Sequence, residues 1–90
     1  MMRVQSKKVH RLYVAAPLGR VMTLVAKYEE SFTAYSAKGY FRGKKESMVV
    51  VEIATNDGKT VVNLGRILRE RFKQDGVGHV VDGKYSRITK

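Results

Sequence analysis

Three cations, Arg42, Lys44 and Lys45, gather in one short segment that also contains a glycine. Such cations do not enter a protein core without partners, so we expect an exposed turn here. Lys38 and Tyr40 precede it at alternating positions and would point outward beside it. Lysine and arginine neutralise phosphates, and an aromatic ring offers a face on which a base stacks. This pattern predicts an anion site for nucleic acid or a nucleotide-type ligand.

A second set of cations, Arg66, Arg69 and Lys73, recurs at three- and four-residue spacing, which is the period of a helix. It extends the predicted anion-binding surface. In the fold expected below, this helix and the open sheet face lie on opposite sides, so the two sets need not form one patch. The alternative is that the first segment is a solvated turn and that Tyr40 covers a neighbouring subunit.

The whole chain carries a strong positive charge. Its 90 residues include 18 Lys and Arg against 8 Asp and Glu, a formal net charge of +10. Such a field favours nucleic acid, nucleotides, an acidic protein surface or anionic lipid, although it also serves solubility alone. The absence of cysteine excludes disulfides, thiolate metal sites and a cysteine nucleophile.

Catalytic chemistry has weak support in the sequence. His10 and His79 are the two histidines, and no third residue at a suitable spacing completes a metal or acid–base site around either. Glu52 lies in an apolar run, where an edge position or a lysine partner would account for it. We therefore predict a binding protein that is not an enzyme, with no catalytic residue, metal or cofactor.

Alternating and helical patterns place these residues on a short series of elements. Residues 9–16 alternate as a strand, and Pro17 ends it. Apolar residues at three- and four-residue intervals predict a helix over 18–30. Strands are expected over 32–41 and 47–54, and they are joined by the basic turn 42–46.

The second half begins with turn-forming residues, of which Asn56, Asp57 or Thr60 would cap a helix. That helix is predicted over 60–74 and is the clearest amphipathic segment. Residues 77–81 read as a strand, and Asp82-Gly83 is a hairpin signal that favours an extra edge strand over 84–88.

This order predicts an α+β fold of ferredoxin-like βαββαβ type, an antiparallel sheet with two helices on one face. We expect a flexible basic arm over residues 1–8 and one domain over residues 9–90. The simplest alternative is an irregular α+β sandwich in which the first helix is misplaced.

The run Ala37-Lys38-Gly39-Tyr40-Phe41-Arg42-Gly43-Lys44, followed by the strand Val49-Val50-Val51-Glu52-Ile53, resembles the second and third strands of PII-like signalling proteins. The resemblance covers about a quarter of the chain. It implies the ferredoxin-like fold, a small ring or dimer, and an anionic nucleotide-like ligand at subunit clefts. Lys38, Gly39 and Arg42 are the positions that it carries over. Phe41 and Gly43 depart from the PII pattern.

Two further functions stay open beside nucleic-acid or nucleotide binding. One is a protein–protein effector, for example a virus-borne inhibitor, whose basic surface docks on an acidic partner. The other is a PII-like sensor of a small ligand. Apolar residues on an open sheet face favour a homo-oligomer. With no long apolar run and no signal-peptide pattern, no membrane partner is expected and the cytoplasm is the expected location.

Overall fold

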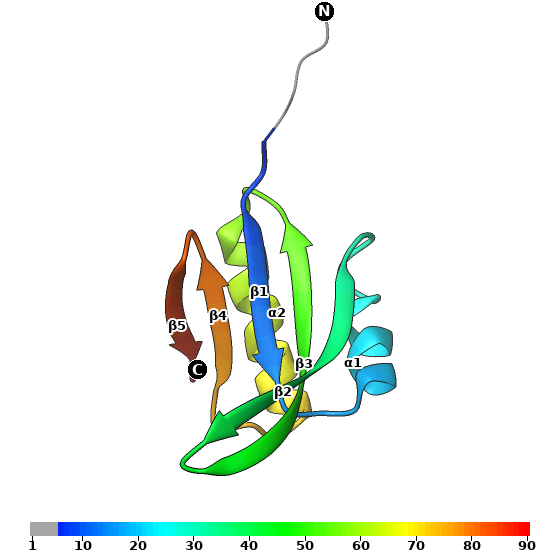
Figure 1. The fold of residues 1–90 in the computed structure, drawn as a ribbon. Helices are drawn as coiled ribbons and strands as arrows, with labels where there is room; N and C mark the ends of the chain where they lie inside the picture. The colour runs from blue at the N-terminus through cyan, green and yellow to red at the C-terminus, as the bar shows by residue number, and fades with distance from the viewer. Residues whose placement is uncertain (1–5) are drawn as a thin grey trace, which may run out of the picture.

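The structure is a computed structural model that describes residues 6–90. Of the expected basic arm, residues 1–5 lie outside the described part. Figure 1 shows the elements, which are β1 (Val9–Val14), α1 (Leu18–Val25), β2 (Thr33–Phe41), β3 (Lys44–Ala54), α2 (Gly58–Arg71), β4 (Val77–Val81) and β5 (Lys84–Ile88). Lys8, the last residue of the expected arm, is held in place because its ammonium lies 3.0 Å from Asp82 and its carbonyl accepts from the Thr55 amide.

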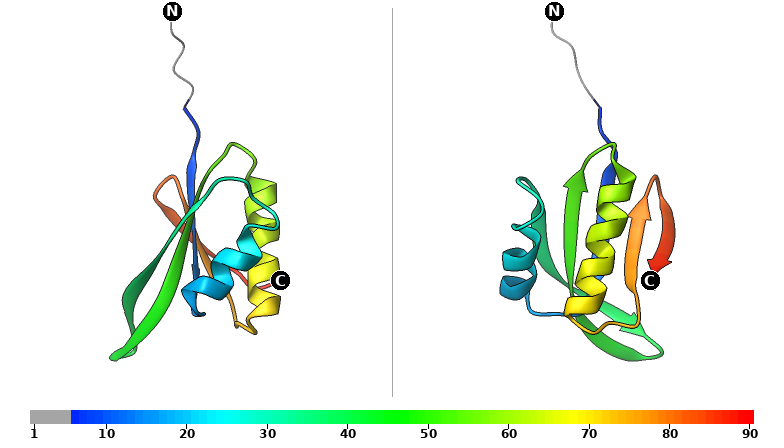
Figure 2. Two further views of the ribbon diagram at one scale, coloured as in Figure 1. Left: turned by 90° about the vertical axis from the view of Figure 1, so that its right-hand side faces the viewer. Right: turned by 180° about the vertical axis from the view of Figure 1, so that it is seen from behind.

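All strands of the described chain join one antiparallel sheet in the order β2-β3-β1-β4-β5. Both helices lie on the same side of this sheet, and the opposite face is open (Figure 2). The α+β class, the order of the elements and the additional C-terminal strand are as the sequence predicts. This arrangement divides the surface into a helix side and an open sheet face.

The core lies between the sheet and the helices. Alternate residues of β1 and β3 point into it, for example Leu12 and Val51, which are fully buried. They meet the apolar stripe of α2, which includes Leu64 and Leu68, as the helical spacing requires. Within residues 6–90, no helix has the length and apolar character needed to span a membrane.

Helix α1 ends at Val25, five residues before the predicted boundary. The amides of Lys27 and Tyr28 donate to carbonyls three residues back, at 3.1 and 2.9 Å, which tightens the final turn and stops the helix. Glu29 and Glu30, which the sequence places inside the helix, fall beyond its last residue.

Helix α2 runs from Gly58 to Arg71, while the sequence predicts 60–74. Of the three predicted caps, Asp57 fills the position: its carboxylate accepts from the Thr60 amide at 3.2 Å and from the Thr60 hydroxyl at 2.6 Å. The same hydrogen bonds lower the pKa of Asp57. Strand β1 likewise stops at Val14, two residues earlier than expected.

Candidate ligand site on the open sheet face

The hairpin β2-β3 turns on two residues, not on the five-residue loop predicted over 42–46. Arg42 and Gly43 have φ angles of 51° and 78°, the left-handed conformation required at both central positions of a tight hairpin turn. Strand β3 therefore begins at Lys44, and Gly39 pairs with Glu46. Because strand residues alternate, Glu46 joins Met48 on the open face of the sheet.

The hairpin extends past the rest of the sheet and curves away from the helices (Figures 1 and 2). Beneath it, the open face contains a hollow of about 510 Å³. This volume lies in the usual range for small-ligand sites. Its lining includes the aromatic residues Tyr13, Tyr40, Phe41 and Tyr85, and the charged residues Glu46, Asp75 and Arg87.

Two glycines shape one wall of this hollow. A Cβ on Gly78 would lie 2.9 Å from Cε2 of Tyr85, so the bare backbone lets the tyrosine ring lie across β4. A Cβ on Gly76 would similarly lie 2.7 Å from Nε of Arg87. The glycines thus allow a ring and a guanidinium to lie close over the sheet.

The two carboxylates of the hollow, Glu46 and Asp75, form no ion pair with any residue from 6 to 90, and neither does Arg87. All three side chains are exposed. The hollow therefore offers acceptors for a cationic ligand group, a donor for an anionic one, and four aromatic faces.

Glu52 lies farther along the same face, at the centre of a polar cluster. Nε of Arg11 donates to its Oε2 at 2.8 Å, and the hydroxyl of Tyr35 donates to the same oxygen at 3.0 Å. These two hydrogen bonds hold the pKa of Glu52 below its ordinary value of 4.5, and the bond to Glu52 raises the pKa of Tyr35. Neither expected account of Glu52 applies, because β3 is an internal strand and the partner is an arginine.

The two histidines form a buried pair on the helix side of the sheet. Nδ1 of His10 and Nε2 of His79 are 2.9 Å apart, and the rings stack with centroids separated by 5.2 Å. Burial, followed by the charge of His10, lowers the pKa of His79. The sequence did not predict this pair. No group of three or more His, Asp or Glu side chains that could hold a metal ion occurs among residues 6–90.

Lys38 and Tyr40 are exposed beside the turn, but they belong to the face of the hairpin that continues the helix side of the sheet. Ala34 packs against the core, so every second residue counted from it lies on the helix side of β2. Lys38 and Tyr40 belong to this set, whereas Tyr35 belongs to the opposite one. Both remain exposed because the hairpin extends beyond the helices. Lys38 donates to the hydroxyl of Ser47 at 2.7 Å, and Tyr40, near the curved tip, still lines the hollow.

The other predicted cations lie in two separate places. Arg42, Lys44 and Lys45 are exposed at the hairpin tip, where the Arg42 guanidinium lies 5.1 Å from the centre of the Phe41 ring. Arg66 and Arg69 lie on α2, which is on the helix side of the sheet (Figure 2), and Lys73 follows the end of that helix. Arg66 donates to the carbonyl of Lys90, and Nε of Arg69 is buried with no partner among the described residues. The structure therefore does not bring the two sets into one patch.

Sequence reasoning missed most residues of the hollow, namely Tyr13, Phe41, Glu46, Asp75, Tyr85 and Arg87. The glycines at positions 76 and 78 are the signal in the sequence that could have indicated the hollow, because glycine in or beside a strand often marks the close approach of another group. Recognition of the two-residue turn would have placed Glu46 on the open face.

No protein-family model matches this chain, and no curated protein matches it. Among solved structures, a phage SAM lyase in its apo state is similar, with a TM-score of 0.70 and 20% sequence identity. The likeness covers 100% of this chain and 95% of that chain. It therefore shows a shared fold over the whole of this chain and nearly the whole of the other.

Proposed function

We propose that this protein binds S-adenosylmethionine (SAM) in the hollow of the open sheet face and cleaves it as a lyase. The observation that carries this proposal is the lining of the hollow, which combines aromatic faces with two carboxylates and one arginine that form no ion pair within residues 6–90. The full-length likeness to a phage SAM lyase supports it. It replaces the prediction of a protein that is not an enzyme.

Each part of SAM finds a matching group in the hollow. Adenine stacks on an aromatic face such as Tyr40 or Tyr85. The ammonium and the sulfonium are cations that a carboxylate or an aromatic ring attracts, and Glu46 and Asp75 are the available carboxylates. The carboxylate of the substrate pairs with Arg87.

The proposed reaction needs no second substrate. The carboxylate of SAM attacks its own γ-carbon, the bond from that carbon to sulfur breaks, and both electrons of the bond go to sulfur. The products are the neutral thioether methylthioadenosine and homoserine lactone, which keeps the positive charge of its ammonium. The contribution of the protein is to hold the adenosine and to fold the flexible chain so that the reacting atoms meet.

Titration calorimetry with SAM tests the proposed site. Glu46→Gln removes one carboxylate of the hollow without changing its size, and we expect SAM affinity to fall about tenfold or more. The matched control is Glu70→Gln, which removes an exposed carboxylate on the helix side and should leave affinity unchanged. Equal affinity in both variants would place SAM outside this hollow.

We further propose the ferredoxin-like fold for this chain, since the strand order with β1 between β3 and β4 supports it.

Self-association is also proposed. Around the hollow, 72% of Tyr40, 57% of Phe41 and 65% of Tyr85 are exposed, and a second copy would cover such a surface. Native mass spectrometry counts the copies, and a monomer at micromolar concentration would exclude this arrangement. We also propose a cytoplasmic location, because the proposed activity needs SAM and SAM is present there.

Nucleic-acid binding is a second candidate function, favoured by the three exposed cations of the hairpin tip, Arg42, Lys44 and Lys45. None of them is paired with a carboxylate of residues 6–90.

A PII-like sensing role stays a prediction. It would be favoured if a nucleotide raises the melting temperature of the protein and oligonucleotides do not.

A further inference from the structure

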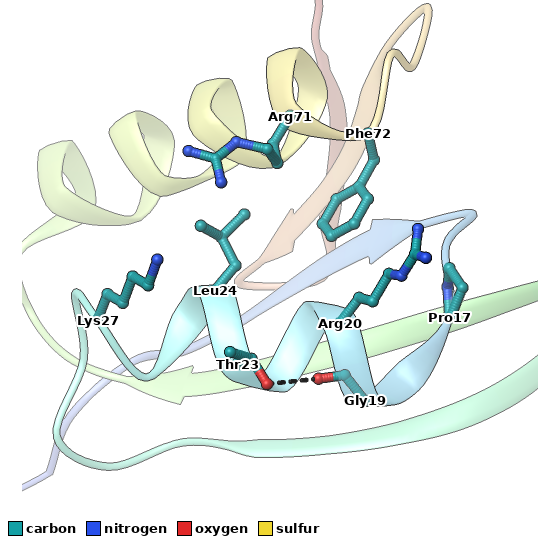
Figure 3. Close-up of a pocket in the computed structure, with 8 residues that line it drawn as sticks. All are labelled: Pro17, Gly19, Arg20, Thr23, Leu24, Lys27, Arg71 and Phe72. Carbon is teal, nitrogen blue, oxygen red and sulfur yellow. Dashed lines mark hydrogen bonds between the residues drawn. The ribbon is translucent and has the colours of Figure 1, made fainter.

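We propose that the groove between α1 and α2 is a docking site for an acidic peptide segment of a partner protein. The groove encloses about 720 Å³, and Figure 3 shows the residues that line it. Both helices lie on the side of the sheet opposite to the open face (Figure 2). Its floor includes Leu24 and Phe72, one from each helix region, and the two side chains face each other across it (Figure 3).

Three cations surround this apolar floor. Arg20 and Lys27 come from the α1 side, and Arg71 comes from the last turn of α2. All three are exposed, and none forms an ion pair with a residue between 6 and 90. Among residues 6–90, no carboxylate lines the groove, and Glu70, the neighbour of Arg71, lines an adjoining hollow beside Tyr28. The groove therefore has a positive rim whose three cations form no ion pair within residues 6–90.

The spacing of the rim cations specifies the size of the occupant. Arg20 and Lys27 are seven residues apart along α1 and its final turn, which corresponds to about 10 Å. Leu24 lies between them, on the same side of the helix. A matching ligand carries negative groups about this far apart with an apolar group between them, as an acidic peptide does with its side chains.

An acidic peptide fits this groove better than a nucleic-acid backbone does. A phosphate backbone presents charge but no apolar group to cover Leu24 and Phe72. A peptide with one leucine or phenylalanine between carboxylates can pair with the cations and also cover the apolar floor. The helix presents the complementary pattern, since cations at positions 20 and 27 lie on either side of an apolar residue. Charge complementarity and the apolar floor thus select the same partner chemistry, and the site is separate from the proposed SAM site.

A selection from random peptides of about 15 residues, displayed on mRNA and captured by the immobilised full-length protein, tests this proposal. The enriched sequences should carry Asp or Glu on both sides of a leucine or aromatic residue. Titration calorimetry of one enriched peptide should then show about tenfold or greater loss of affinity in the double variant Arg20→Glu, Arg71→Glu.

The matched control is Lys59→Glu with Lys84→Glu, which makes the same change of net charge at exposed positions outside the groove. It should keep the affinity of the wild-type protein within about threefold. The neutral double variant Arg20→Gln, Arg71→Gln repeats the test if charge reversal disturbs folding, as circular dichroism would show. Failure to enrich any peptide, enrichment without acidic residues, or equal loss in both charge-reversed variants would overturn the proposal.

Discussion

The ring of Tyr85 on β5 lies across Gly78 of the adjacent β4, so close that a Cβ at position 78 would be 2.9 Å from Cε2 of the ring. Because 65% of Tyr85 is exposed, we expect Gly78→Ala to displace the ring into solvent. The change should weaken SAM binding severalfold, as measured by calorimetry, while the melting temperature falls only slightly.

The control for this substitution is Gly19→Ala in α1, where an added Cβ meets nothing within 4 Å. Alanine is a better helix former than glycine, so this variant should gain about 0.5–1 kcal/mol of unfolding free energy at most. SAM affinity should not change, because Gly19 lies on the helix side. Unchanged affinity in Gly78→Ala would show that Tyr85 does not help to form the site.

The Arg11–Glu52–Tyr35 cluster predicts a measurable titration. Since hydrogen bonds from Arg11 and Tyr35 lower the folded-state pKa of Glu52, its ionised form contributes stability above pH 4.5, and that contribution is lost as pH falls through the lowered pKa. Carbon-detected NMR of the carboxyl group should find this pKa below 4.5. In Arg11→Met the pKa should move upward, and no movement would mean that the ion pair does not form in solution.

The buried histidine pair predicts a loss of stability in mild acid. The pKa of His79 is lowered from 6.5 in the folded protein, so the unfolded chain takes up the proton first as pH falls. This stability is complete above pH 6.5 and declines as pH falls toward the folded-state value. The hollow next to His79 is lined by Lys59 and Arg66 and, among residues 6–90, by no carboxylate.

Urea unfolding at several values between about pH 7 and about pH 5 tests whether stability falls as the pH is lowered. The wild-type protein should lose stability across this interval. The double variant His10→Leu, His79→Leu removes both imidazoles, so its stability should change less with pH over the same range. An equal slope in the two proteins would assign the acid sensitivity to other groups.

The hairpin tip predicts salt-dependent binding of nucleic acid. Fluorescence titration with single-stranded RNA or DNA should show an affinity that falls steeply as salt rises, because phosphate contacts release counterions. Replacing Arg42, Lys44 and Lys45 by glutamine should reduce both the affinity and the salt slope. The comparison is the variant in which Arg66, Arg69 and Lys73 are replaced by glutamine. If it loses more affinity than the hairpin variant, the binding surface lies around α2. No affinity at low salt would reject the second candidate function.

The sequence was sufficient for the α+β class and the order of the elements, because strand alternation and the stripe through Val61, Leu64 and Leu68 are local patterns. Helix and strand ends were less accurate. The end of α1 at Val25 depends on tight hydrogen bonds of its last turn, and the start of β3 at Lys44 depends on the backbone angles of Arg42 and Gly43. Neither is encoded in hydrophobic periodicity.

The site was harder to predict than the fold. The cations of the hairpin tip were found from composition, but the hollow draws Tyr13 from β1, Glu46 from β3 and Arg87 from β5. These residues meet through strand register and through the curvature of the hairpin, which no local pattern reveals. The pairing of His10 with His79, 69 residues apart, likewise depends on both β1 and β4 being placed in one sheet.

Incubation of the purified protein with SAM, followed by mass spectrometry of the products, tests the proposed activity most directly. We predict that SAM disappears while methylthioadenosine and homoserine lactone form in equal amounts, and that Glu46→Gln slows this while Glu70→Gln does not. SAM that persists at the rate of a protein-free control, with no methylthioadenosine above that control, would contradict the proposed function.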